Sequence, residues 1–228
     1  MDFFPLLNSL RIAALSSVIV FFLGIFAAYY VSKRGRVLKG ILDVIFTLPL
    51  VLPPTVIGYF LLVTFGARRP LGLFLAEFSI QFVMTWYGGV LTAAVIAFPL
   101  MYRTARGAFE RFDESLAHAG QTLGLSNTYI FWRIRMPYCR QGILAGLVLA
   151  FARALGEFGA TVMLIGYIPG QTATVATTVY HFWRIGDETT AFRWVIINLA
   201  ISAVVLLSMN LLEQNDTLPH PKRERWIS

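Results

Sequence analysis

Residues Ala117–Thr161 read AHAGQTLGLSNTYIFWRIRMPYCRQGILAGLVLAFARALGEFGAT and change from polar to apolar along their length. The first part is polar and basic, the last part is an apolar run that contains Arg153 and Glu157, and Pro137 lies between the two. A polar segment followed at once by an apolar run of membrane length predicts a helix in water joined to a helix in a bilayer. Such an arrangement would suit a membrane helix that moves when a soluble partner pushes on the adjoining helix.

The composition indicates an integral membrane protein. Of the 228 residues, 57% are hydrophobic and 14% are charged, and the mean hydropathy is +0.68. Soluble domains carry about 25% charged residues, so a soluble fold this apolar would lack polar surface. The net charge of +7 does not indicate nucleic-acid binding, because the basic residues lie in short loops between apolar runs. Cys139 is the only cysteine, so no intramolecular disulfide is expected.

Apolar runs predict about five membrane spans in one domain over residues 1–212. A helix needs about 20 apolar residues to cross a bilayer. The runs that qualify are 10–31, 41–65, 87–102, 143–165 and 194–212. Two shorter apolar segments, 71–86 and 173–183, are expected to be re-entrant or interfacial helices, with a further span at 71–86 as the alternative. We therefore predict an all-α membrane fold, followed by a flexible cytoplasmic tail over 213–228.

The basic residues predict the orientation of these spans. Lysine and arginine gather in the loops after the first and third spans and in the C-terminal tail, whereas the remaining loops hold few. Cytoplasmic loops of membrane proteins are enriched in lysine and arginine. We therefore place the C-terminus in the cytoplasm and the N-terminus outside.

The centre of the longest cytoplasmic loop, residues 114–125, is predicted to be a helix. Its residues Leu116, Ala119, Gly120 and Leu123 recur at helical spacing and would form one apolar face with small residues. Such a face fits either the groove of a partner protein or the membrane surface. Gly124 is the expected C-cap, and Ser126-Asn127 is expected to start the next turn.

Two of the predicted spans carry residues that are unusual in a membrane. Arg153 and Glu157 lie four residues apart in 143–165, a spacing at which their side chains can pair on one helix face. The pair is either a packing device or part of a transport path. In 41–65, Pro53 and Pro54 remove two amide donors, which indicates either a simple kink or a discontinuous helix beside a substrate path.

The cytoplasmic loop resembles the signature of permease subunits of bacterial ABC importers. That signature is Glu-Ala-Ala, three residues, Gly, nine residues, Ile, one residue, Leu-Pro. This chain matches it in spacing at His118-Ala119-Gly120, Gly124, Ile134, Met136 and Pro137. It departs from the signature at His118, Gly120 and Met136, so this chain lacks the acidic side chain of the first position but keeps the spacing of the segment.

Two further segments narrow the resemblance to molybdate permease subunits. These are PLVLPPTVIGY at 49–59 and ARALGEFGAT at 152–161. Sulfate/thiosulfate and tungstate permeases share the LGEFG theme, so they are the alternatives for the transported oxyanion.

The resemblance implies a type I ABC importer permease fold in the bacterial cytoplasmic membrane. In that family the segment corresponding to 114–137 is the coupling helix, which docks into a cleft of an ATPase subunit. The residues this assigns to coupling are His118, Ala119, Gly120, Leu123, Gly124, Ile134 and Pro137. Those expected at the translocation pathway or gate are Pro53, Pro54, Thr55, Arg153, Glu157 and Thr161. The implied partners are a second copy of the chain, two ATPase subunits, an extracytoplasmic oxyanion-binding protein and the lipid bilayer.

The sequence does not predict an enzyme or a cofactor site. A phosphate-binding loop needs Gly-Lys-Ser/Thr, but Lys33, Lys39 and Lys222 follow Ser, Leu and Pro. ATP and Mg are therefore expected on the partner ATPase. The three histidines are dispersed, which indicates no metal site. Two other classes stay open: an ion-coupled secondary transporter, with Glu157 or Asp43 as its ion site, and a membrane enzyme, for which no catalytic set is recognisable.

Overall fold

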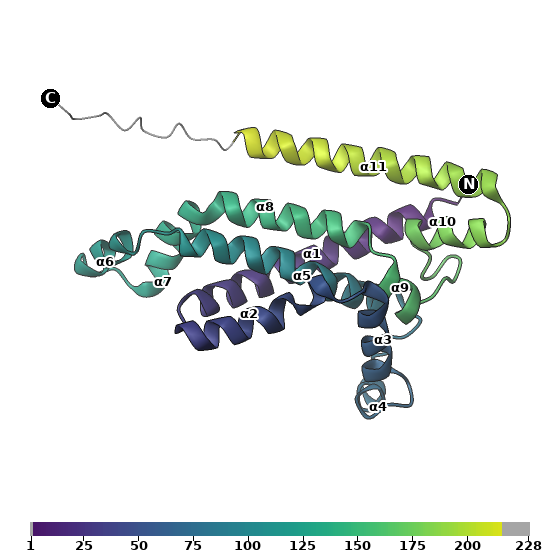
Figure 1. Ribbon diagram of the computed structural model, residues 1–228, viewed down its shortest axis with the longest axis horizontal. Helices are drawn as coiled ribbons and strands as arrows, with labels where there is room; N and C mark the ends of the chain where they lie inside the picture. The colour runs from purple at the N-terminus through teal and green to yellow at the C-terminus, as the bar shows by residue number, and fades with distance from the viewer. Residues whose placement is uncertain (1, 216–228) are drawn as a thin grey trace.

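The computed structural model describes residues 2–215, and in this range every regular element is a helix (Figure 1). The elements are α1 (Phe4–Ser32), α2 (Arg36–Val51), α3 (Pro54–Phe65), α4 (Pro70–Glu77), α5 (Trp86–Glu110), α6 (Glu114–Thr122), α7 (Asn127–Ile130), the π-helical turn η1 (Phe131–Arg135), α8 (Met136–Leu155), α9 (Gly159–Leu164), α10 (Val175–Arg184) and α11 (Glu188–Asn215). The all-α prediction is confirmed for this part of the chain. Of the predicted tail, 213–215 continue α11, and 216–228 lie outside the described residues.

Helices α1, α5 and α8 form the centre of a bundle and run side by side in Figure 1. The 29 residues of α1 correspond to about 44 Å of helix, which exceeds the roughly 30 Å hydrocarbon core of a bilayer. The buried positions of these helices are mostly small or β-branched, as at Ala28, Val31, Ala97 and Ala105. The exposed positions of α1 are mostly large and apolar, as at Phe22, Leu23 and Phe26, which is expected for side chains that face lipid.

Glycines set how closely α5 and α8 approach. A Cβ added at Gly146 would lie 2.1 Å from Thr104 Oγ1, and one added at Gly142 would lie 2.7 Å from Ala108 Cβ. Small residues allow this approach in membranes, where van der Waals packing rather than water exclusion holds helices together.

Charged and aromatic side chains attach α2 to the bundle. Asp43 accepts a hydrogen bond from the Tyr102 hydroxyl and forms an ion pair with Arg106. Glu110 forms ion pairs with Lys39 and with Arg106 Nε, the latter at 3.1 Å. These contacts matter because no residue of α2 is fully buried. Asp43, considered above as a coupling-ion site, is thus held by α5.

At the other end of the bundle, polar contacts attach α1 to the segment before α10. Asn8 Nδ2 donates to the Ala173 carbonyl at 3.0 Å, and the Val175 amide donates to Ser9 Oγ at 2.9 Å. Thr174 and Thr177 then form a capping box that starts α10. With 10 residues, α10 is too short to span a bilayer, which needs about 20. Helix α4 has eight residues and is also too short to span a bilayer; it covers only 71–77 of the segment 71–86 that was considered for a further span.

Two predicted spans differ from single helices. Residues 41–65 form α2 and α3, which are bent by 108° at Leu52-Pro53, because Pro53 and Pro54 lack amide donors for the turn before them. Residues 143–165 are also broken: α8 ends at Leu155, Gly156 is its C-cap, and α9 starts at Gly159. Four described helices are long and apolar enough to cross a membrane, or five if α2 and α3 count as one broken span.

The packing at Gly146 can be tested by adding volume. We expect Gly146→Val to lower the free energy of unfolding by about 1–3 kcal/mol, because the core has no room for the added methyl groups. The control is Gly40→Val in α2, where an added Cβ meets nothing within 4 Å. Thermal unfolding in detergent should separate the two variants by several degrees, at about 2–4 °C per kcal/mol for a chain of this size. Equal melting temperatures would contradict the packing analysis.

Candidate functional site

The residues predicted for ATPase coupling and for the translocation pathway lie in two regions of the structure. One is the segment α6–α7–η1, which protrudes beyond the bundle at one end (Figure 1). The other is the pair of helix breaks, α2/α3 and α8/α9, toward the opposite end of α8.

Local capping signals fix the ends of α6. Asp113 is the N-cap, and its carboxylate accepts a hydrogen bond from the Ser115 amide at 2.9 Å. Hydrogen bonds from Ser115 lower the pKa of Asp113 below its usual value. At the other end Gly124 has φ of +75°, and the amides of Gly124 and Leu125 donate to the carbonyls of Gln121 and Gly120. This is a Schellman motif, in which Leu123 is the C-cap and Gly124 is the next residue, one position beyond the predicted C-cap.

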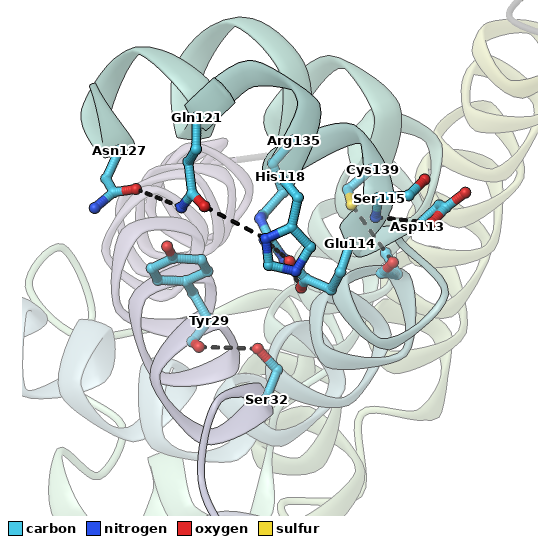
Figure 2. Close-up of polar contacts among 11 residues, drawn as sticks. Tyr29, Ser32, Asp113, Glu114, Ser115, His118, Gln121, Asn127, Arg135 and Cys139 are labelled. Carbon is cyan, nitrogen blue, oxygen red and sulfur yellow. Dashed lines mark hydrogen bonds and ion pairs between the residues drawn. The ribbon is translucent and has the colours of Figure 1, made fainter. Parts of the chain in front are cut away.

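The next helix starts as predicted. Ser126 is the N-cap of α7, and its hydroxyl accepts a hydrogen bond from the Tyr129 amide at 3.2 Å. Gln121 Nε2 donates to Asn127 Oδ1 at 3.1 Å, which ties α6 to the start of α7 (Figure 2).

The apolar face predicted for α6 is divided between two directions, which corrects the sequence analysis at Gly120. Gly120 is buried, and a Cβ there would lie 3.1 Å from Ile130 and 3.4 Å from Ile134. Gly120 therefore packs α6 against Ile130 of α7 and Ile134 of η1. Leu116, Ala119 and Leu123 point outward, and Leu123 is 79% exposed. An apolar surface of α6 is thus left without a partner within the described chain.

The first signature position, His118, is also exposed. Its Nδ1 lies 3.4 Å from Gln121 Oε1 in the same helix. It therefore makes no hydrogen bond that fixes α6 to another element among those described.

Pro137 lies inside a continuous helix that runs from Asn127 to Leu155. A proline in a helix interior lacks its amide donor, and its ring crowds the carbonyl four residues earlier, here that of Arg133. The chain widens into the π-helical turn η1 just before this position, where the Met136 amide donates to the Phe131 carbonyl. The segment next to α6 is therefore joined to α8 as one helix rather than through a hinge.

Sequence reasoning missed the ion pair between Glu114 and Arg135 (Figure 2). Arg135 Nη1 and Nη2 donate to the two carboxylate oxygens of Glu114 at 2.7 and 2.6 Å. These bonds lower the pKa of Glu114 below its usual value. The pair therefore persists at neutral pH, and it is lost only as pH falls through the lowered pKa. The two residues are separated by 21 positions, so no local spacing rule could have paired them.

The two helix breaks face one another. A Cβ added at Gly159 would lie 2.9 Å from Pro54 Cβ and 3.3 Å from the Thr55 amide nitrogen. A Cβ added at Gly58 would lie 2.7 Å from the Ala160 Cα. The structure thus brings the predicted residues Pro54 and Thr55 next to the segment that carries Glu157.

Glu157 is not on the same helix as Arg153, because it lies beyond the end of α8. The predicted pair nevertheless forms, with Arg153 Nη1 2.7 Å from Glu157 Oε2. The other carboxylate oxygen accepts a hydrogen bond from the Ala160 amide at 2.7 Å and so caps the N-terminus of α9. Each charge lies at the helix end whose dipole favours it. Glu157 is 3% exposed, so both partners are needed to compensate its burial.

Thr161 is buried within the chain, at the contact between α9 and α5. It is 1% exposed, and its Oγ1 lies 3.4 Å from Thr92 Oγ1 on α5. In this conformation Thr161 packs α9 against α5, whereas Thr55 is exposed at the start of α3. Among the residues that the structure describes, no three His, Cys, Asp or Glu side chains gather into a metal site.

Comparison with known proteins identifies the family. The model of the family described as "Binding-protein-dependent transport system inner membrane component" matches residues 20–215. The molybdenum transport system permease protein ModB of Escherichia coli K12 is 42% identical over 203 residues, 88% of this chain and 89% of that protein. The molybdenum transport system permease protein YvgM of Bacillus subtilis is 38% identical over 205 residues, 90% of each chain.

Solved structures share the fold at low sequence identity. A chain of the MetNI methionine ABC transporter has a TM-score of 0.71 and 13% identity, and the match covers 92% of this chain and 94% of that one. A chain of a bacterial ABC transporter involved in the import of alginate has a TM-score of 0.77 and 16% identity, and the match covers 94% of this chain and 79% of that one. The fold is thus that of type I ABC importer permeases. With the family model and these relatives matching most of its length, the chain belongs to the family of binding-protein-dependent transport system inner membrane components.

Proposed function

We propose that this chain is the membrane permease of an ATP-driven importer of molybdate. The observation that carries this proposal is the 42% identity to a molybdenum transport permease over nearly the whole of both chains. Two copies would form the pathway at their interface, and an extracytoplasmic binding protein would deliver the oxyanion. Sulfate, thiosulfate and tungstate remain the alternative substrates by resemblance, but the relatives compared above are molybdenum permeases.

ATP and Mg would be bound by a separate ATPase on the cytoplasmic side, where α6 would dock. The exposed Leu116, Ala119 and Leu123 give α6 an apolar surface of the kind that inserts into a groove. From α6, the continuous helix Asn127–Leu155 leads to Arg153 and the break at Glu157. A push on α6 would thus reach the paired breaks through one rigid element. With α6 on the cytoplasmic side, the N-terminus would be outside and the C-terminus cytoplasmic.

The pathway would suit an anion because its buried carboxylate is neutralised. Arg153 compensates the charge of Glu157, and the α9 amide bonded to Glu157 compensates it further. Both carboxylates considered for an ion-coupled cycle, Asp43 and Glu157, are held by arginines. The ion pairs therefore favour an ATP-driven importer over an ion-coupled secondary transporter.

Reconstitution tests the proposed function directly. Proteoliposomes that contain this chain, its cognate ATPase and the loaded binding protein are expected to accumulate molybdate only when ATP reaches the ATPase. Radiometric or mass-spectrometric uptake measures this, with excess sulfate or tungstate as competitors. Accumulation by this chain alone, driven by an ion gradient, would contradict the proposal.

The docking role of α6 can be tested at Leu123. We expect Leu123→Glu to reduce ATPase binding and uptake at least about tenfold, because burial of a leucine is worth about 1.5–3 kcal/mol and a buried carboxylate costs more. The control is Val37→Glu, which changes a residue that is 77% exposed at the start of α2. Co-purification of the ATPase gives the binding readout. Equal loss in both variants would argue against docking at α6.

The helix break can be tested at Glu157. We expect Glu157→Gln to leave Arg153 without a counter-charge, to lower the free energy of unfolding by about 1–3 kcal/mol and to impair uptake. The figure is below that for a fully buried pair because the Arg153 side chain is 31% exposed. The control is Glu188→Gln at the exposed start of α11. Unchanged melting and uptake in Glu157→Gln would mean that the pair has no role in the gate.

A further inference from the structure

We infer that Glu114 and Arg135 act as positioning residues that transmit the movement of α6 to the membrane helix. This inference rests on the proposed function, and it assigns a role to two residues whose type the importer signature does not specify. We call the two residues, together with the rings of Tyr29 and Phe112, the clamp.

The clamp has a buried centre. The Arg135 guanidinium carbon lies 4.2 Å from the centre of the Phe112 ring and 5.6 Å from that of the Tyr29 ring. Arg135 is 4% exposed, although it belongs to a segment that protrudes from the bundle. Its two bonds to Glu114 are parallel, and this geometry fixes both distance and direction. The arginine is thus held between α1, the α5–α6 corner and α6 itself.

The remaining attachments of α6 resist displacement less well. Ala117 and Gly120 are buried, the latter against Ile130 and Ile134, but they contribute one methyl group between them. The Gln121–Asn127 hydrogen bond is exposed to water. The covalent link from α6 to α7 is the turn 123–126. A turn transmits a displacement less well than a helix, because its backbone bends more easily. Of the ion pairs described, Glu114–Arg135 is the one that connects α6 to another element.

The position of Arg135 decides where a displacement of α6 would act. Arg135 is the last residue of η1, and Met136 begins α8. A load carried by the clamp therefore enters at the start of α8 and bypasses both the turn 123–126 and α7. Because the helix is continuous to Leu155, the same load reaches Arg153 and the break at Glu157.

The test separates transmission from simple structural support. Glu114→Gln strands a buried arginine, so we expect it to lower stability as well as transport. In the double variant Glu114→Gln with Arg135→Met, no unpaired charge remains, and the methionine side chain occupies the space between the Tyr29 and Phe112 rings. We expect this double variant to recover wild-type stability and assembly. We also expect it to use at least about fivefold more ATP per molybdate ion imported than the wild type.

The readouts are melting temperature, co-purified ATPase, ATP hydrolysis and molybdate uptake in proteoliposomes of the complete complex. Arg133→Met is the matched control, because Arg133 is an exposed arginine two residues from Arg135. Its ratio of ATP to molybdate should equal that of the wild type. A double variant that regains a wild-type ratio together with its stability would overturn the inference.

A conservative variant covers the case in which the double variant does not assemble. Arg135→Lys keeps the charge and the contact with the rings but loses the two-pronged bond to Glu114. We expect a raised ATP-to-molybdate ratio with a normal yield of complex, and a wild-type ratio would again overturn the inference. If instead the wild-type complex imports no molybdate with ATP, the proposed function fails, whatever the variants do.

Discussion

Backbone amides at a broken membrane helix must find partners inside the protein, because lipid offers none. The arrangement at Glu157 meets this requirement. Its carboxylate accepts the Ala160 amide at the start of α9, and Arg153 at the end of α8 compensates the charge. The neighbouring break at Pro53-Pro54 packs directly on Gly159, where only a glycine leaves room. Each break thus stabilises the other, and a movement of α8 that displaced Arg153 would disturb both.

This dependence gives the continuous helix Asn127–Leu155 its importance. Its 29 residues span about 44 Å and connect a surface exposed to solvent with the buried carboxylate. A proline inside such a helix usually kinks or breaks it. Here the wider π-helical turn η1 accommodates Pro137, which has no amide donor, and the helix continues through it. The same turn presents Arg135 to Glu114, so the site that accommodates the proline also anchors α6.

Local signals in the sequence predicted much of this structure. Residue type predicts the end of α6 near Gly124 and the N-cap of α7 at Ser126, and the apolar runs predict the long helices. Three features were not predictable in this way. The break at Gly156–Phe158 lies in an apolar run whose composition fits an unbroken helix. The inward orientation of Gly120 depends on where α7 and η1 fold back. The pairing of Glu114 with Arg135 depends on tertiary structure, because basic residues in this loop are equally well explained by membrane orientation.

Small residues and charges have complementary roles in this chain. Glycines at 58, 142, 146 and 159 bring helices together, and such contacts permit sliding because they are short-ranged and lack direction. Ion pairs are directional. At α2 and α6 they hold helices that bury few residues, and at the α8/α9 break an ion pair compensates a buried carboxylate. A gate that has to move without coming apart needs both kinds of contact. In the proposed gate the glycines would allow helices to shift against one another, and the arginines would determine which elements shift together.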